Sequence, residues 1–558
     1  MKMNHFIQRN HRILFYLTWF IINIIQAVTT ELFDDEAYYW IYSQFPAWGY
    51  FDHPPMIAFL IKAGGFIFSG ELGVRLLVVL LNTGSLFLIE KLLNRKDPYL
   101  FYAICLSIAV AQIGGMIAVP DLPLLFFVSL FFFTYKRYVS HLSIANTVLL
   151  GVTIALMLYS KYHGVLIVLL TLLSNIKLFA RYQTYIVAAV SLTLFTPHLY
   201  WQYLHDFPSV QFHLFERNAK NFNISYTLEY ILGQLLLAGP IMGWLFIWSS
   251  YKHSPDSATE RALKFSLFGL YIFFLISTLK GRVEANWTAP AFVALIVLSH
   301  QYLITKPLLT KWVYRALPVT VALVLIARIF MIWNMPPAKW LSKDEFHGNK
   351  VWVNEVKKYA GNLPVVILNS YQRPSKYWFY SGNPAMALNT PAYRRNNFNY
   401  WPIEDSFINK RVYVLGTYDT VYFHTPFKSR TLDGYGGRVI ENYYSFSKLK
   451  LVNVKTRYLD NKVSISFTAR TTDYYLTYFQ KQPFDTASIY VAFTNEKLKV
   501  RYIPTGLKIS QIKSSEQQMD FIFSSNLKPG KYSAKLAIST CIPRQASLNS
   551  TSFNITIP

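Results

Sequence analysis

Apolar segments of membrane-spanning length recur through residues 1–335 of the chain. A helix needs about 20 mainly apolar residues to cross the hydrocarbon core of a bilayer. The candidate spans are residues 13–28, 74–93, 99–118, 122–138, 142–160, 164–179, 184–202, 227–248, 263–279, 288–304 and 313–333. Residues 55–68 are apolar but interrupted by Lys62 and a glycine pair, so we expect a helix that lies along the interface. The pattern predicts an α-helical polytopic membrane domain with about 11 transmembrane helices.

The distribution of charge along the chain predicts its orientation. The formal net charge is +25, and five connecting loops are basic: residues 91–96, 136–137, 177–181, 252–264 and 306–315. Alternation of the spans places all five on the side of the N-terminus, so the basic balance is explained without a nucleic-acid partner. We expect a multi-pass protein of the inner (plasma) membrane, with its N-terminus cytoplasmic and its C-terminal domains periplasmic or exoplasmic. Residues 1–28 also resemble a signal peptide, but the many later spans favour an uncleaved first helix.

After residue 335 the sequence takes on the character of a water-soluble protein. Residues 364–370 and 411–415 have the pattern of buried strands around a short helix at 373–380, which predicts a small α/β domain over residues 336–448. Alternating strands and turn signals over residues 449–558 predict a β-sandwich. The only two cysteines, Cys105 and Cys541, imply neither a disulfide framework nor a thiolate metal site.

Three consecutive carboxylates, Asp34, Asp35 and Glu36, follow the first apolar run, where the chain leaves the bilayer. A carboxylate at this place can accept the proton of a hydroxyl or amine that attacks an activated carbon. A second acid can bind a metal or the hydroxyls of a sugar. The alternative is a solvated loop whose acids cap the following helix. The triplet alone does not decide between these interpretations.

Aromatic residues and a histidine follow the three acids, in the segment from Trp48 to Pro55. Tyr50 and Asp52 would suit a sugar-binding surface, whereas an interfacial aromatic belt would explain the same residues without a ligand. His53 precedes two prolines, which force a non-helical entry into the next segment. This histidine either donates to a phosphate or has a structural role.

Further charged residues lie at the ends of spans on the acidic side of the membrane. Asp121 either supplements the first loop or caps the helix that follows it. Basic residues on this side run against the positive-inside trend and would suit a lipid-linked phosphate, although snorkelling side chains are the alternative. The residues of this group are Lys161, Arg217, Lys280 and Arg282, with Glu284 and Trp287 close to the last two in sequence.

Taken together, these motifs resemble the dolichyl-phosphate-mannose protein mannosyltransferase superfamily. The motifs are Asp35-Glu36, Tyr50-Phe-Asp-His-Pro-Pro55, Pro120-Asp-Leu-Pro123, Ser160-Lys-Tyr-His-Gly164 and Glu284-Ala-Asn-Trp287. The resemblance covers residues 10–335 and is to the bacterial branch, which includes the aminoarabinose lipid A transferases. It implies a GT-C type membrane glycosyltransferase that takes sugar from a polyprenyl-phosphate donor at the exoplasmic face.

The resemblance also implies roles for individual residues. Asp35 matches the catalytic aspartate of the family's first loop, Glu36 its acidic neighbour, and Asp121 a further acid at the end of a span. Lys161 and Arg217 resemble positions that contact the donor phosphate. His53 stands where aminoarabinose transferases carry a phosphate-binding lysine, and this departure affects the identity of donor and acceptor.

We therefore expect an inverting glycosyltransferase whose acceptor is a lipid, a glycan or a protein. The expected catalytic residues are Asp35, Glu36 and Asp121; the donor-phosphate residues are His53, Lys161, Arg217, Lys280 and Arg282; and the substrate-binding residues are Asp34, Tyr50, Asp52, Glu284 and Trp287. A divalent metal is compatible with this many carboxylates, but their spacing does not require one. The rival hypothesis is a transporter or flippase of lipid-linked sugars, which would usually show internal repeats that this sequence lacks.

Overall fold

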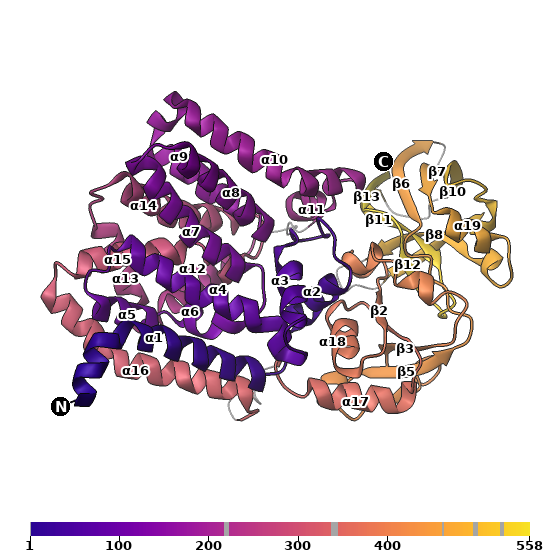
Figure 1. Cartoon of the computed structure of the whole chain (residues 1–558). Coiled ribbons are helices and arrows are strands. Elements are labelled where there is room, and N and C mark those ends of the chain that lie inside the picture. Colours follow the sequence, from indigo (N-terminus) through magenta and orange to yellow (C-terminus); the bar gives the residue numbers. More distant parts are fainter. Residues whose placement is uncertain are drawn as a thin grey trace. The chain divides into compact units, whose positions relative to one another are not determined.

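The computed structural model (Figure 1) describes residues 2–216, 222–335, 344–459, 462–494, 500–524 and 529–557. The chain divides into two compact units, Met1–His347 and Gly348–Pro558. The first unit is helical and the second is rich in β-sheet, so the expected order of a helical membrane region and a β-rich C-terminal region is confirmed. The three domains expected from the sequence, residues 1–335, 336–448 and 449–558, stay a prediction.

The first unit consists of helices and short helical turns. They are α1 (Lys2–Thr29), α2 (Asp34–Gln44), α3 (Met56–Gly65), α4 (Gly70–Leu92), α5 (Pro98–Ser107), α6 (Ala109–Ile113), η1 (Gly114–Met116), α7 (Asp121–Ser140), α8 (Ile144–Ser160), α9 (Gly164–Ser174), η2 (Ile176–Ala180), α10 (Tyr182–Leu204), α11 (Pro208–Gln211), η3 (Phe212–Glu216), α12 (Ile224–Ala238), α13 (Gly243–Lys252), α14 (Ala258–Ser277), η4 (Ala285–Thr288), α15 (Ala291–Leu303) and α16 (Pro307–Ile332). Hydroxyl and carboxylate caps set several helix starts: Asp97, Ser143 and Ser257 each accept a backbone N–H of the first turn.

Four helices among the described residues are long and apolar enough to cross a membrane: Gln8–Thr29, Gly70–Leu92, Asp121–Ser140 and Pro307–Ile332. A bent pair, Ile224–Ala238 with Gly243–Lys252, raises the number to 5 if it forms one span. Five further apolar helices have 10–17 residues. The helical membrane region is therefore confirmed, whereas the expected number of about 11 spans stays a prediction.

Two segments expected as continuous spans are broken in the structure. Residues 99–118 divide at Ile108, whose backbone is extended, into α5 and α6. Residues 227–248 bend by 89° between α12 and α13. Here Gly239 has a φ of +144°, and Pro240 supplies no N–H to continue a helix. Hydropathy alone gives no signal of such breaks, because the residues on both sides are equally apolar.

The second unit begins with an α/β part. Its elements are α17 (Asn349–Ala360), β1 (Val365–Leu368), α18 (Gln372–Ser381), β2 (Ala385–Leu388), η6 (Asn397–Asn399), η7 (Glu404–Ser406), β3 (Val412–Thr417), β4 (Thr425–Pro426), η8 (Arg430–Leu432) and β5 (Tyr435–Ile440). The five strands form one sheet in the order β2-β1-β3-β5-β4. β1 pairs in parallel with β2 and β3, as expected of strands joined through a helix, and β5 is antiparallel to β3. The strands predicted at 364–370 and 411–415 are present.

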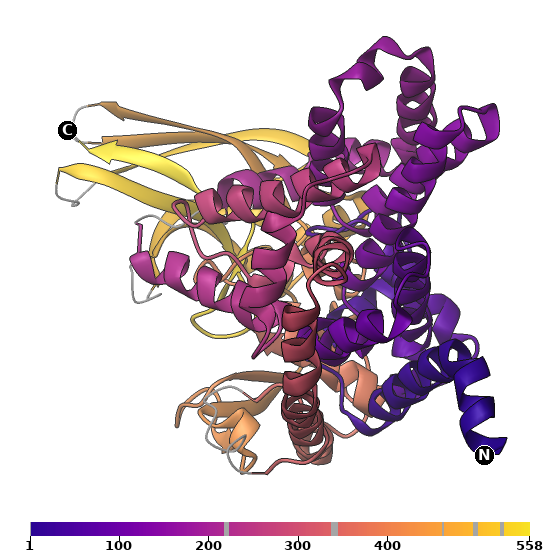
Figure 2. The ribbon, with the colours of Figure 1, turned by 90° about the vertical axis from the view of Figure 1, so that its left-hand side faces the viewer.

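Two antiparallel sheets complete the second unit. Their elements are β6 (Lys450–Leu459), β7 (Lys462–Arg470), α19 (Asp473–Phe479), η9 (Phe484–Thr486), β8 (Ser488–Thr494), β9 (Val500–Lys508), η10 (Ile509–Gln511), β10 (Glu516–Ser524), β11 (Gly530–Ser539), β12 (Ala546–Leu548) and β13 (Phe553–Ile557). One sheet has the order β10-β7-β6, and the other has β12-β11-β8-β9, with β13 beside β11. Figure 2 shows these long strands running alongside one another. Ile465 and Phe521 from one sheet and Val491 and Leu536 from the other belong to the same buried cluster, so the sheets pack face to face.

A buried carboxylate, Glu404, links the α/β part of the second unit to its antiparallel sheets. Its two oxygens accept hydrogen bonds from the backbone and hydroxyl of Ser445, from the backbone and hydroxyl of Ser447, and from the hydroxyl of Tyr475 at 2.7 Å. Burial, together with the nearby Glu404, raises the pKa of Tyr475 well above its ordinary value, so this hydroxyl keeps the proton that it donates. Segments more than forty residues apart meet at this single side chain.

Replacing Glu404 by alanine is expected to lower the free energy of unfolding of the C-terminal unit by at least about 3 kcal/mol, because several buried donors lose their acceptor together. Hydrogen exchange of the full-length protein at the amides of Ser445 and Ser447 measures the effect. Glu441→Ala is the control: Glu441 is 68% exposed in its pair with Arg411, so it should contribute less than about 1 kcal/mol. Equal loss of protection in both variants would contradict the proposed role of Glu404.

Candidate functional site

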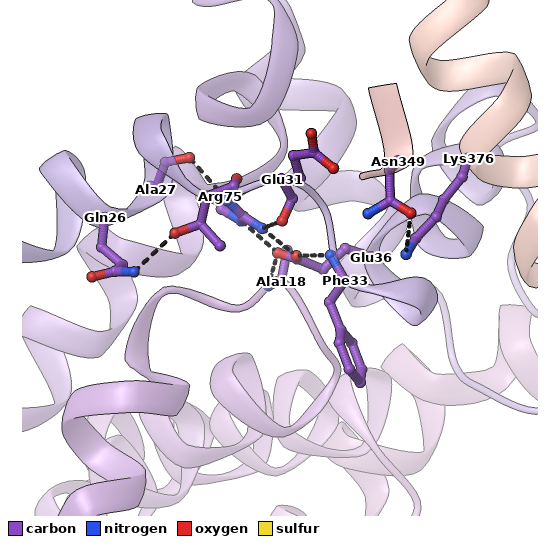
Figure 3. Close-up of polar contacts among 10 residues, drawn as sticks. Gln26, Ala27, Glu31, Phe33, Glu36, Arg75, Ala118, Asn349 and Lys376 are labelled. Atoms are coloured by element: carbon purple, nitrogen blue, oxygen red, sulfur yellow. Dashed lines mark hydrogen bonds and ion pairs between the residues drawn. The ribbon is translucent and has the colours of Figure 1, made fainter. Parts of the chain in front are cut away.

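A fully buried arginine of α4, Arg75, organises the region of the first acidic loop. Nη1 donates to the carbonyls of Ala27 (2.9 Å) and Thr30 (2.6 Å), and Nη2 donates to the carbonyl of Glu31 (3.0 Å) and to Glu36 Oε2 (2.5 Å). Nε donates to Glu36 Oε1 at 2.7 Å (Figure 3). A guanidinium group has five N–H donors, so every donor of Arg75 has an acceptor.

Glu36, in the first turn of α2, accepts from two backbone amides besides Arg75. The N–H of Phe33 donates to Oε2 at 2.9 Å, and the N–H of Ala118 donates to Oε1 at 2.7 Å (Figure 3). The carboxylate therefore fixes the end of α1, the start of α2, α4 and the segment before α7 against one another. These contacts favour an anchoring role for Glu36 over the expected catalytic one.

Asp34 and Asp35 share the first turn of α2 with Glu36 but are only partly buried. The positive end of the helix dipole stabilises the ionised form of carboxylates in this turn. The anchored Glu36 fixes the backbone that carries them. Of the three consecutive acids, Asp34 and Asp35 are thus the two that are only partly buried.

The segment after α2 is an aromatic support for Asp52 and His53. The ring of Tyr50 stacks on that of Tyr42 at 3.9 Å between centroids, and its buried hydroxyl donates to two backbone carbonyls. The hydroxyl of Tyr42 donates to Asp52 Oδ1. His53 lies edge-on to Tyr39 at 5.5 Å. Tyr50 and Tyr42 therefore hold the loop in place. Both residues that were predicted to bind substrate here are buried: Tyr50 is 1% exposed and Asp52 is 7% exposed.

Hydrogen bonds attach this loop to α10 and to the segment after it. Nδ1 of His198 lies 2.7 Å from the carbonyl oxygen of Trp48, and Nε2 of His213 lies 2.9 Å from the carbonyl oxygen of Asp52. Because a carbonyl only accepts, each of these nitrogens carries a hydrogen. The other nitrogen of His198 lies 3.0 Å from the hydroxyl of Tyr162, the residue after Lys161. The loop and the turn between α8 and α9 are therefore parts of one network.

Lys161 and Asp121 form a buried ion pair at this turn. Nζ of Lys161 lies 2.7 Å from Asp121 Oδ1, and the side-chain amide of Asn286 donates to Oδ2 at 3.1 Å. Lys161 is 5% exposed and Asp121 is 4% exposed. Asp121 is the first residue of α7, but the N-cap position belongs to Pro120. The two carboxylate oxygens of Asp121 contact Lys161 and Asn286 instead of capping the helix. These contacts favour a role for Asp121 in positioning Lys161.

The remaining predicted cations and their neighbours are more peripheral. Lys280, Arg282 and Glu284 are exposed, and Arg282 pairs with Glu229 at 3.2 Å. The ring of Trp287 lies 5.4 Å from that of His163 and therefore has a packing role. Arg217 lies outside the described residues.

The structure thus brings most of the predicted inner residues into one region. Glu36 is bonded to Ala118, three residues before Asp121, and Asp121 is paired with Lys161. The ring of His213 lies 5.9 Å from that of Tyr162 and 6.4 Å from that of His53. Among the described residues, no group of three or more histidines, cysteines or carboxylates has a geometry that could hold a metal ion.

Several contributors to the site were not predicted, among them Arg75, His198 and Asn286. Arg75 lies in the apolar run 74–93, and an arginine inside a membrane span is a signal that could have identified it. Asn286 lies inside the motif from Glu284 to Trp287. The charged first residue and the aromatic last residue of this motif were selected as candidates, and the asparagine between them was passed over. His198 gave no signal, because a lone histidine in an apolar run has no sequence partner.

Comparisons with known proteins agree with the resemblance inferred from the sequence. Residues 52–201 match the family model described as dolichyl-phosphate-mannose-protein mannosyltransferase. The chain is 25% identical over 304 residues to the lipid A galacturonosyltransferase RgtD of Rhizobium johnstonii. This alignment covers 51% of the chain and 63% of that relative's length. The expected resemblance to the mannosyltransferase superfamily is confirmed, and the chain is a multi-pass membrane protein.

Two crystal structures of ArnT from Cupriavidus metallidurans have a similar fold. The apo form has a TM-score of 0.54 at 14% identity and covers 74% of this chain and 94% of its own. The form bound to undecaprenyl phosphate has a TM-score of 0.53 at 14% identity and covers 73% and 93%. The fold of this chain is therefore ArnT-like.

Glu36→Gln keeps the shape of the side chain but leaves the charge of Arg75 without a counter-ion. Breaking a buried pair in this way costs about 3–5 kcal/mol, so we expect the thermal unfolding midpoint of the detergent-solubilised protein to fall by at least about 5 °C. Glu229→Gln removes the same charge from the exposed pair with Arg282 and should shift the midpoint by less than about 2 °C. Equal midpoints for the two variants would contradict the anchoring role.

Proposed function

We propose that this protein is an inverting membrane glycosyltransferase that transfers a sugar from a polyprenyl-phosphate donor to an acceptor at the periplasmic face. The observation that carries the proposal is the link between the helix turn of the partly exposed Asp34 and Asp35 and the segment of the buried ion pair. Glu36 of that turn accepts a hydrogen bond from Ala118, three residues before the Asp121 that pairs with Lys161. Three similarities support the proposal: the match to the mannosyltransferase family, the similarity to the galacturonosyltransferase RgtD, and the ArnT-like fold.

In this proposal Asp35 is the general base. The acceptor oxygen or nitrogen attacks the anomeric carbon as the bond from that carbon to the phosphate oxygen breaks on the opposite face, and Asp35 takes the proton of the acceptor. Asp34 and Asp52 bind hydroxyl groups of the substrates. Glu36 and Asp121 contribute by holding Asp35 and Lys161 in position.

The departing polyprenyl phosphate changes from a diester with one negative charge to a monoester with two. Cations near this group stabilise the additional charge as it develops. We assign this role to Lys161 and His53 in the interior of the site. Lys280 and Arg282 are the candidates at its edge, Arg217 is a further candidate from the sequence alone, and Glu284 completes the substrate-binding surface.

The acceptor that we propose first is lipid A, because RgtD is a lipid A galacturonosyltransferase. For the donor we propose undecaprenyl phosphate as the lipid carrier, since an ArnT structure of the same fold holds this lipid.

The topology completes the proposal. With about 11 spans and a cytoplasmic N-terminus, the basic loops face the cytoplasm and the loop of Asp35 faces the periplasm. The short apolar helices then cross the membrane together with neighbouring helices. Residues 336–448 and 449–558 form two periplasmic domains.

Asp35→Asn keeps the size of the side chain but removes the base. We expect transfer of radiolabelled sugar from undecaprenyl-phosphate donors to lipid A to fall by about a hundredfold or more, with donor binding retained. Glu71→Gln, which neutralises an acid in the first turn of α4, is the control and should keep transfer.

Full transfer by the Asp35→Asn variant would assign the base to Asp34, Glu36 or Asp121 instead. If the wild-type protein transfers no sugar from any polyprenyl-phosphate donor but moves labelled lipid across the bilayer of a liposome, the protein is a flippase and the proposal is wrong.

Lys161→Met removes the interior cation but keeps a long apolar side chain. Because a charge-assisted hydrogen bond to phosphate contributes about 1.5–3 kcal/mol, we expect undecaprenyl phosphate to bind about tenfold or more weakly. Microscale thermophoresis of the detergent-solubilised protein measures this affinity. Lys306→Met changes an exposed lysine in a basic loop and serves as the control. Unchanged affinity in Lys161→Met would exclude Lys161 from the phosphate site.

A further inference from the structure

A cavity of about 300 Å³ lies between α1, α5 and α16, away from the residues assigned to the proposed reaction. Most of its lining is apolar or aromatic and includes Leu14, Phe15, Trp19, Ile22, Tyr102 and Leu106. In Figure 1, α1 and α16 run side by side. In the most apolar stretch of each of these two helices only 22% is buried within the protein. Both helices therefore present most of their surface to lipid.

One cation, Arg328 of α16, lines this otherwise apolar cavity and is 4% exposed. Its Nη2 donates to Asn23 Oδ1 at 3.0 Å and to the carbonyl of Gln112. Nε and Nη1 have no hydrogen-bond partner, and no carboxylate pairs with the group, among the residues that the structure describes. A buried charge without a counter-ion is strongly unfavourable, and in membrane spans such residues usually pair or serve a function.

The shape of the cavity suits a chain molecule. Its lining extends along α1 from Asn23, beside Arg328, to His11. Twelve residues of α-helix correspond to about 18 Å, so an extended hydrocarbon chain can lie along α1 while its headgroup is near Arg328.

We infer that this cavity binds a membrane lipid with an anionic phosphate headgroup, whose phosphate pairs with Arg328 and whose chain lies along α1. Guanidinium and phosphate form bidentate hydrogen bonds, and an apolar groove facing the bilayer excludes a free ion in favour of one with a hydrocarbon tail. Neither Nε nor Nη1 is at the surface, so the guanidinium group turns toward the cavity when the lipid binds.

The headgroup end of the cavity is connected to the anchor of the proposed active site. The side-chain amide of Gln26 donates to the carbonyl of Arg328 at 3.2 Å and to the hydroxyl of Thr30 at 2.8 Å. The carbonyl of Thr30 in turn accepts from Arg75 (Figure 3). A lipid at Arg328 is therefore connected, through Gln26 and Thr30, to the end of α1 on which Arg75 depends. The inference does not require the proposed function, because neither Asp35 nor Lys161 takes part in it.

The test is native mass spectrometry of the full-length, delipidated protein titrated with phosphatidylglycerol or phosphatidylcholine. We expect the wild-type protein to bind one phosphatidylglycerol at least about tenfold more tightly than phosphatidylcholine. Arg328→Met should lose this preference. Arg315→Met, at an exposed position of the same helix and outside the cavity, should keep it.

Thr18→Trp provides a second variant that leaves every charge in place. Thr18 lines the cavity, so the indole should fill it and abolish the tight lipid, even if Arg328→Met fails to fold. Retention of the preference in Thr18→Trp, or in folded Arg328→Met, would overturn the inference. Equal binding of inorganic phosphate would overturn it too, since the hydrocarbon groove would then contribute nothing. Loss of undecaprenyl phosphate but not of phosphatidylglycerol in Arg328→Met would assign the cavity to the donor carrier instead.

Discussion

The structure of the helical unit depends on the cost of placing an arginine inside an apolar helix. Arg75 is wholly buried, and an unpaired guanidinium group there would be prohibitively unfavourable. The chain offsets this cost with three backbone carbonyls from the end of α1 and the loop after it, and with Glu36. These acceptors are available only if α1 ends, α2 begins and α4 passes at the places observed. The arginine therefore specifies the geometry of the first loop.

The same logic recurs at two other buried charges of this protein. Lys161 is held by Asp121, and Asp121 in turn by Asn286, across a separation of more than one hundred residues. In the C-terminal unit Glu404 gathers donors from two other segments, one with Ser445 and Ser447 and one with Tyr475. Each of these buried charges thus joins distant parts of the chain. Arg328 is different, since two of its nitrogens have no acceptor among the described residues.

The sequence was sufficient for the features that depend on local pattern. Apolar runs predicted the helical region and the buried strand β1, and alternation predicted strands such as β7, because burial on one or both faces leaves a regular signal. The break at Ile108 was missed because a run of apolar residues does not record where a helix bends, whereas the dipeptide Gly239-Pro240 was an overlooked signal for the second break. Glu36 was predicted to be catalytic, and its anchoring contacts were not foreseen, because they depend on Arg75, which lies in another helix.

The charge of the site sets a requirement for the proposed transfer. Asp121 already offsets the charge of Lys161, so this pair adds no net positive charge to the site. The leaving phosphate nevertheless gains one negative charge as the glycosidic bond breaks. Either Lys161 exchanges its carboxylate for the phosphate, or another cation approaches the phosphate. His53 can supply that charge only when it is protonated, whereas a lysine at the same place would supply it throughout the neutral range. In this mechanism the exposed Lys280 is therefore a second source of positive charge in addition to His53, whereas Arg282 is already paired with Glu229.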